Sequence, residues 1–89
     1  MDYILNKNGT QIMIETQALE LKKQIAEQYK TVRVSKRISQ EKAASAAGMA
    51  RPDVSRFESG KYNPSLELMI RYAEALGCDL KVELVPRKE

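Results

Sequence analysis

The chain has 89 residues, of which 43% are hydrophobic and 30% are charged, and its formal net charge is +3. These values predict one small ordered domain, and the basic excess permits a nucleic-acid partner without requiring one. Histidine is absent and cysteine occurs once, at Cys78. Zinc sites of Cys and His and Ser-His-Asp triads are therefore excluded. Carboxylate-only catalysis stays open in principle, but the acidic residues form no obvious pair. We expect neither an enzyme nor a bound cofactor or metal.

A single cysteine cannot form an intramolecular disulfide, which favours a reducing compartment. No apolar run reaches the length of a membrane span, and the first residues lack the features of a signal peptide. The sequence therefore predicts a cytoplasmic protein without a membrane partner.

Residues 1–19 have two interpretations. Short apolar runs at 3–5 and 11–14 flank Asn8 and Gly9, a dipeptide that favours a two-residue hairpin turn. The segment is either a short β-hairpin or strand, or a mobile arm. From about Thr16 to Lys36 the spacing becomes helical. Its apolar stripe consists of Leu21, Ile25, Tyr29 and Val32.

Two short helices joined by a tight turn follow. Ser39 is a good N-cap for the first, and Gly48 can adopt the left-handed conformation that ends it. Pro52 fits the first turn of the second helix, where its missing amide has no partner to lose. Val54 and Phe57 are expected to face the core. The outward positions are Arg51, Pro52, Ser55, Arg56 and Ser59.

A fourth helix is predicted after Pro64, with Ser65 as N-cap and Gly77 as its end. Its expected apolar stripe is Leu66, Met69, Ile70, Ala73 and Leu76. Residues 80–85 then alternate as a β-strand does. A lone strand needs a partner, which could be the N-terminal segment or the same strand of a second subunit.

Residues 20–78 resemble the Xre family of DNA-binding domains, which includes the lambda and related phage repressors and Cro. The resemblance is carried by Ser39-Gln40, Ala44, Gly48, Val54 and Glu58-Ser59-Gly60, and by the segments "NPSLE" and "AEALG". It implies a mainly helical, lambda-repressor-like bundle of four to five helices. To this bundle the sequence adds a short C-terminal β-strand.

The resemblance also implies roles for single residues. The groove-facing positions correspond to Arg51, Pro52, Ser55 and Arg56, and arginine can bond to guanine in the major groove. Solvated surface arginines are the alternative. Gln40 would contact phosphate while bracing the reading helix, and Lys61 and Asn63 suit phosphate contacts. Two positions depart from the family pattern, because Ala50 cannot cap a helix and Pro52 replaces a polar residue.

The resemblance further implies that Arg33 and Glu58 form an ion pair inside the domain rather than a catalytic or recognition site. Proteins of this type bind palindromic double-stranded DNA operators as homodimers. We expect residues 79–89 to dimerise, with Leu80, Val82 and Leu84 facing the core.

The tail resembles that of the HigA-type and HipB-type antitoxins. This implies a repressor that regulates its own operon and neutralises a cognate toxin protein, with residues 1–19 as a candidate toxin-binding extension. The alternatives are a stand-alone Xre-type regulator of phage or chromosomal origin and a pure protein-interaction module.

Overall fold

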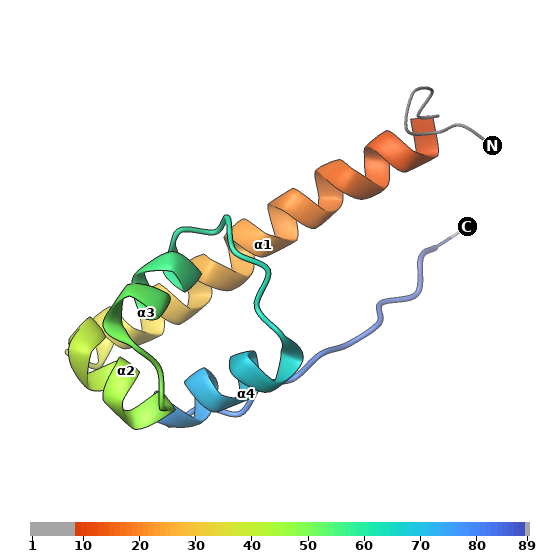
Figure 1. The fold of residues 1–89 in the computed structure, drawn as a ribbon. Helices are drawn as coiled ribbons and strands as arrows, with labels where there is room; N and C mark the ends of the chain where they lie inside the picture. The colour runs from red at the N-terminus through yellow and green to blue at the C-terminus, as the bar shows by residue number, and fades with distance from the viewer. Residues whose placement is uncertain (1–8, 89) are drawn as a thin grey trace.

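The computed structural model describes residues 9–88 and contains four α-helices in that range. Helix α1 (Gly9–Ser35) is much longer than α2 (Gln40–Ala47), α3 (Arg51–Glu58) and α4 (Leu66–Ala75). The C-terminal half of α1 packs with the three short helices, while its N-terminal half extends beyond them (Figure 1). The expectation of a mainly helical bundle is confirmed. No helix within residues 9–88 is both long and apolar enough to cross a membrane.

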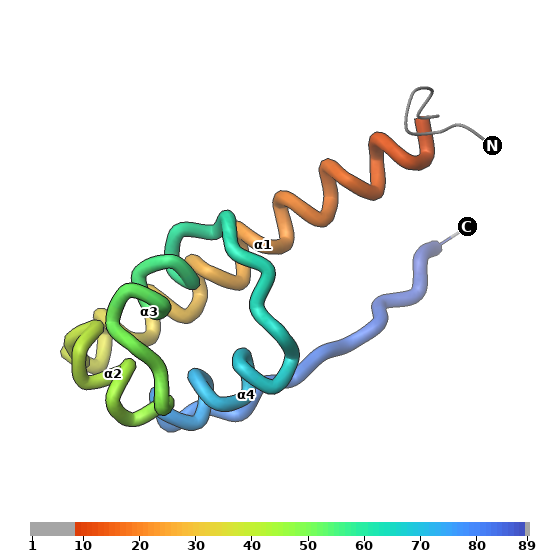
Figure 2. Tube along the Cα trace, viewed as in Figure 1, coloured from red at the N-terminus to blue at the C-terminus, as the bar shows by residue number. Residues whose placement is uncertain are grey.

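Both ends of the chain differ from the sequence prediction. The predicted N-terminal hairpin is wrong for the described residues, because Gly9 to Glu15 form the first turns of α1. The rest of the predicted hairpin, residues 1–8, lies outside the described residues. Within residues 9–88 no β-strand forms, and residues 78–88 have no regular secondary structure. This tail runs outward in the same general direction as the N-terminal half of α1 (Figure 2).

Local capping defines the short helices as their sequences predict. The Ser39 hydroxyl accepts a hydrogen bond from the Lys42 amide at the start of α2, and the Ser65 hydroxyl accepts one from Leu68 at the start of α4. Gly48 ends α2 with φ of 68°, a conformation that glycine adopts without the steric penalty of a Cβ atom. The chain then turns sharply from α2 into α3.

The core is built from small residues of α2 and three aromatic rings. Ala43, Ala44 and Ala47 are buried, which lets α3 and α4 approach α2 closely. The rings of Tyr29 and Phe57 lie 4.7 Å apart between centroids, and Tyr72 lies 5.0 Å from each of them. These mixed edge-to-face and tilted contacts add to the free energy gained by burial.

The apolar stripe predicted for α4 is only partly correct. Ala73 and Leu76 are buried and Met69 is partly buried, but Leu66 and Ile70 are exposed. Tyr72, which the prediction left out, is completely buried. It lies three residues after Met69 and four before Leu76, so helical spacing would have placed it on the buried stripe.

One carboxylate connects all four helices. Glu58, at the end of α3, accepts hydrogen bonds from Arg33 Nε at 2.7 Å, Gln40 Nε2 at 3.2 Å and Tyr72 Oη at 2.6 Å. The second guanidinium bond, from Arg33 Nη2 to Glu58 Oε1, is 3.0 Å long and makes the pair bidentate. We call Arg33, Gln40, Glu58 and Tyr72 the Glu58 network.

The network explains how a buried charge is tolerated here. The side chains of Arg33 and Glu58 are only 11% and 4% exposed, so water solvates neither group well. Burial acts to raise the pKa of Glu58, but hydrogen bonds from Arg33, Tyr72 and Gln40 outweigh it and hold that pKa below its ordinary value. The pKa of Tyr72 is raised by burial and by its bond to Glu58. Glu58 is therefore ionised and Tyr72 neutral at pH 7.

Replacing Glu58 by alanine should lower the free energy of unfolding by about 3–5 kcal/mol, because Arg33 would remain buried without its counter-charge. Urea unfolding followed by circular dichroism measures this loss. Glu67→Ala is the matched control, since it breaks the exposed Arg71–Glu67 pair and should cost less than about 1 kcal/mol. Equal losses in the two variants would contradict a structural role for the network.

The lowered pKa of Glu58 also predicts how stability depends on pH. Because the folded pKa lies below the unfolded one, the ionised carboxylate stabilises the fold above about pH 4.5. That contribution disappears as the pH falls through the folded pKa. The wild-type advantage over Glu58→Gln should therefore be full at pH 7 and shrink between pH 5 and pH 3. An advantage that stays constant over this range would show that the pKa is not lowered.

Candidate nucleic-acid interface

Helix α3 presents two contrasting faces. Val54 and Phe57 are buried and fix the helix against the core, whereas the opposite face is open to solvent. The exposed side chains on this face and on the turn that follows it are Arg51, Pro52, Ser55, Arg56, Ser59 and Lys61. The predicted groove-facing residues thus lie together on one exposed surface, which we call the α3 surface.

The start of α3 lacks the usual cap. Ala50 makes no side-chain capping bond, as its sequence implies, and Pro52 occupies the first turn. Asp53, also in that turn, places a negative charge near the positive end of the helix dipole. Its Oδ1 also accepts a hydrogen bond from Arg56 Nη1 at 3.2 Å. The first turn therefore holds without a capping side chain.

The Arg56–Asp53 pair leaves the guanidinium available to a ligand. The two side chains are 59% and 43% exposed, and exposed pairs at this spacing contribute little free energy. A phosphate or base edge could therefore replace Asp53 as the partner of Arg56 at small cost. Arg51, at the first position of α3, is exposed. Two arginines thus lie on one side of the helix, at its start and near its end.

Gln40 links this surface to the rest of the domain. It is the first residue of α2, is partly buried, and donates to Glu58 at the end of α3. This bond is the bracing contact that the resemblance implied. The second Nε2 hydrogen of Gln40 and the backbone amides at the α2 N-terminus can donate to an anion, so its phosphate contact remains a prediction.

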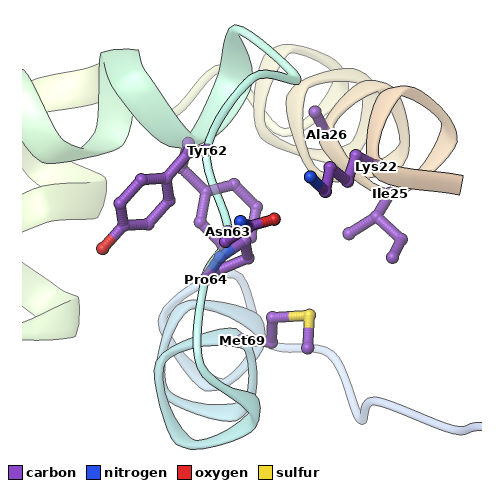
Figure 3. A pocket seen from close by; sticks show the side chains of 8 residues that line it. Lys22, Ile25, Ala26, Tyr62, Asn63, Pro64 and Met69 are labelled. Carbon is purple, nitrogen blue, oxygen red and sulfur yellow. The ribbon is translucent and has the colours of Figure 1, made fainter. Parts of the chain in front are cut away.

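The loop after α3 places Lys61 and Asn63 differently. Both are exposed, but Asn63 lines a pocket of about 160 Å³ between α1, this loop and α4 (Figure 3). Gly60, with φ of 77°, brings the loop against the backbone of Lys23 on α1. A side chain at Gly60 would strain this conformation and contact α1, so the glycine fixes the loop at the end of the α3 surface.

The three predicted tail residues differ in their surroundings. Leu80 packs against the core, but Val82 and Leu84 are 76% and 97% exposed. The expectation that all three face the core is therefore wrong for the single chain. Val82 and Leu84 lie where the tail has left the bundle, and no helix within residues 9–88 covers them.

Comparison with protein families agrees with this geometry. A helix-turn-helix family model matches residues 30–82, which is more than half of the chain and includes α2, α3 and α4. Searches of curated proteins and of solved structures gave no significant match. The chain belongs to the helix-turn-helix family of DNA-binding transcription regulators.

Proposed function

We propose that this protein is a repressor that binds a twofold-symmetric DNA operator as a homodimer and reads it with the α3 surface. The observation that carries the proposal is the contrast between the two faces of α3. Its inner face is fixed by Val54, Phe57 and the Glu58 network, while Arg51 and Arg56 remain exposed on its outer face. A helix held in this way can enter a major groove without first losing conformational freedom.

The residues of the α3 surface divide into two kinds of contact. Arg51 and Arg56 have the donor geometry to bond guanine O6 and N7, which discriminates between bases by roughly 1–3 kcal/mol. Pro52 offers only an apolar contact, such as one with a thymine methyl group. Gln40, Lys61 and Asn63 would bind phosphates and set the register on the duplex.

Homodimerisation follows from the small size of this surface. One short helix reads few base pairs, so two copies on half-sites about one helical turn apart are needed for a specific site. The exposed Val82 and Leu84 support a dimer contact through the tail, because apolar side chains this exposed gain free energy when a partner covers them. Antiparallel pairing of residues 80–85 from two copies would also satisfy their backbone groups.

We further propose that the protein is the antitoxin of a toxin–antitoxin pair and regulates its own operon. The alternative is a stand-alone regulator. The alternating residues 80–85, which resemble the tail of HigA-type and HipB-type antitoxins, favour the first, although they form no strand in the single chain. Expression of the neighbouring reading frame separates the two. If the protein is an antitoxin, the product of the neighbouring reading frame should stop growth when it is expressed alone. Co-expression of this protein should restore growth. A harmless neighbour, or one that stays toxic, would favour the stand-alone regulator.

Changing Arg51 and Arg56 together to alanine should abolish specific binding to the protein's own promoter and reduce the salt dependence of the remaining binding. Fluorescence anisotropy at several salt concentrations measures both effects. A Lys30→Ala, Arg71→Ala variant is the control, since it removes two exposed cations outside the α3 surface and outside the tail. If the α3 variant binds as tightly as the control, the α3 surface is not the DNA-reading face.

A further inference from the structure

An apolar seam runs along α1, and no other part of the described chain covers its N-terminal part. The seam follows alternating spacings of four and three residues, the pattern of a helix that packs lengthwise against another helix. Its apolar members are Ile14, Ala18, Leu21, Ile25 and Val32, and the polar Gln28 occupies the remaining position of the same spacing. Ile25 and Val32 reach the core of the domain, whereas Ile14, Ala18 and Leu21 are exposed. The same stripe that packs α1 onto the bundle therefore continues along its protruding half.

The seam borders a groove on the tail side. Leu21, Ile25 and Gln28 of α1 line a space of about 370 Å³ together with Met69 and tail residues 80–83. Val82, one of the exposed tail residues, lies on the other wall of this groove. The groove therefore joins two apolar surfaces that lack a partner within residues 9–88.

We propose that the α1 seam is a homodimer contact, in which α1 of a second copy packs antiparallel along residues 14–25. That the protein dimerises rests on the proposed function. The new inference is that a dimer contact lies on α1, outside the α3 surface and outside the tail. Burying a half-exposed isoleucine or leucine side chain stabilises the association through the apolar area removed from water. The heptad-like spacing is self-complementary, so a second copy of the chain fits it.

The antiparallel direction follows from the side chains that the register brings together. With the twofold axis between residues 19 and 20, the small Ala18 faces the large Leu21 of the second copy, and Ile14 faces its Ile25. Glu15, which accepts a hydrogen bond from Gln11 in its own helix, comes near Lys22 of the second copy. A parallel pair would instead stack Ala18 on itself and bring Glu15 near Thr10. The antiparallel pair has better size and charge complementarity.

The same register gives a separation that suits DNA. Tyr29, where α1 enters the aromatic core, lies about 9.5 residues from the axis, so about 19 residues of helix separate the two copies of Tyr29. At a rise of 1.5 Å per residue the two cores would be about 28 Å apart along the helix pair. Half-sites one helical turn apart are separated by roughly 34 Å, so the two values are similar. The axis also passes near Leu21, which shares its groove with Val82, so helix and tail contacts can belong to one interface.

The test compares two double variants of the full-length protein by sedimentation velocity. Ile14→Lys with Leu21→Lys places two charges on the seam, where the native side chains are 52% and 46% exposed. Ile12→Lys with Leu19→Lys makes the same substitutions at the same spacing on a different face, at 54% and 48% exposure. We expect the wild type and the second variant to sediment as dimers and the seam variant as a folded monomer by circular dichroism.

Three results would overturn the proposal: a monomeric wild type, a seam variant that stays dimeric, or an equal loss in both variants. The last result would show that charges on either face of α1 disrupt the dimer, so that the contact is not confined to the seam. DNA affinity measured on the same samples keeps the two proposals distinct, because half-site binding by a monomeric wild type would preserve the α3 reading surface while excluding the seam contact.

Disulfide trapping tests whether the two α1 helices run antiparallel, and it does not need charged variants. In a Cys78→Ser background, Ala18→Cys protein mixed with Leu21→Cys protein should give a mixed disulfide under mild oxidation, identified by mass spectrometry. Neither should pair readily with itself. Preferential self-pairing of the Ala18→Cys protein would show a parallel helix pair and contradict the proposed arrangement.

Discussion

The ionised carboxylate of Glu58 is the interaction on which the arrangement of the four helices depends. Burying a charge is costly, and this cost is offset only when the group is paired and fully hydrogen-bonded. Glu58 meets the condition with donors from α1, α2 and α4, while it is itself the last residue of α3. Each donor comes from a different helix, so losing any helix from its place would leave a buried polar group without a partner. The network therefore specifies one arrangement among those that apolar packing alone would allow.

This constraint matters because α3 is too short to hold its own position. Eight residues form about two turns, and such a helix is unstable without tertiary contacts. Val54 and Phe57 anchor its inner face, and Glu58 ties its end to Gln40 at the start of α2. The outer face is therefore not needed to hold α3 in position, and its arginines can bind a ligand. Rigidity on one face and availability on the other are what base recognition requires of a reading helix.

The predictions made from the sequence are correct where short-range rules decide the structure. The Ser39 cap, the left-handed Gly48 and the Ser65 cap depend on neighbours within four residues, and all three form as predicted. The predictions are wrong where distant contacts or the extension of a helix decide the structure. The hairpin predicted around Gly9 does not form in the described residues, because Gly9 is the first residue of α1.

Two other differences have the same origin in long-range contacts. Helical spacing is enough to place Tyr72 on the buried stripe of α4, but it does not reveal that the Tyr72 hydroxyl donates to Glu58. Alternation in residues 80–85 indicates an extended conformation but not its partner, so the single chain leaves Val82 and Leu84 exposed. The α3 surface was predictable because its motif combines several local signals at fixed spacing.

DNA should contact the α3 surface while the Glu58 network stays intact. Amide chemical shifts of the full-length protein, recorded by NMR during titration with a duplex of its own promoter, test this most directly. We expect the largest changes at Arg51 to Ser59 and Lys61, at the start of α2 and in the loop that holds Asn63, with little change at Tyr72. Changes confined to other surfaces, with α3 unaffected by the duplex, would contradict it.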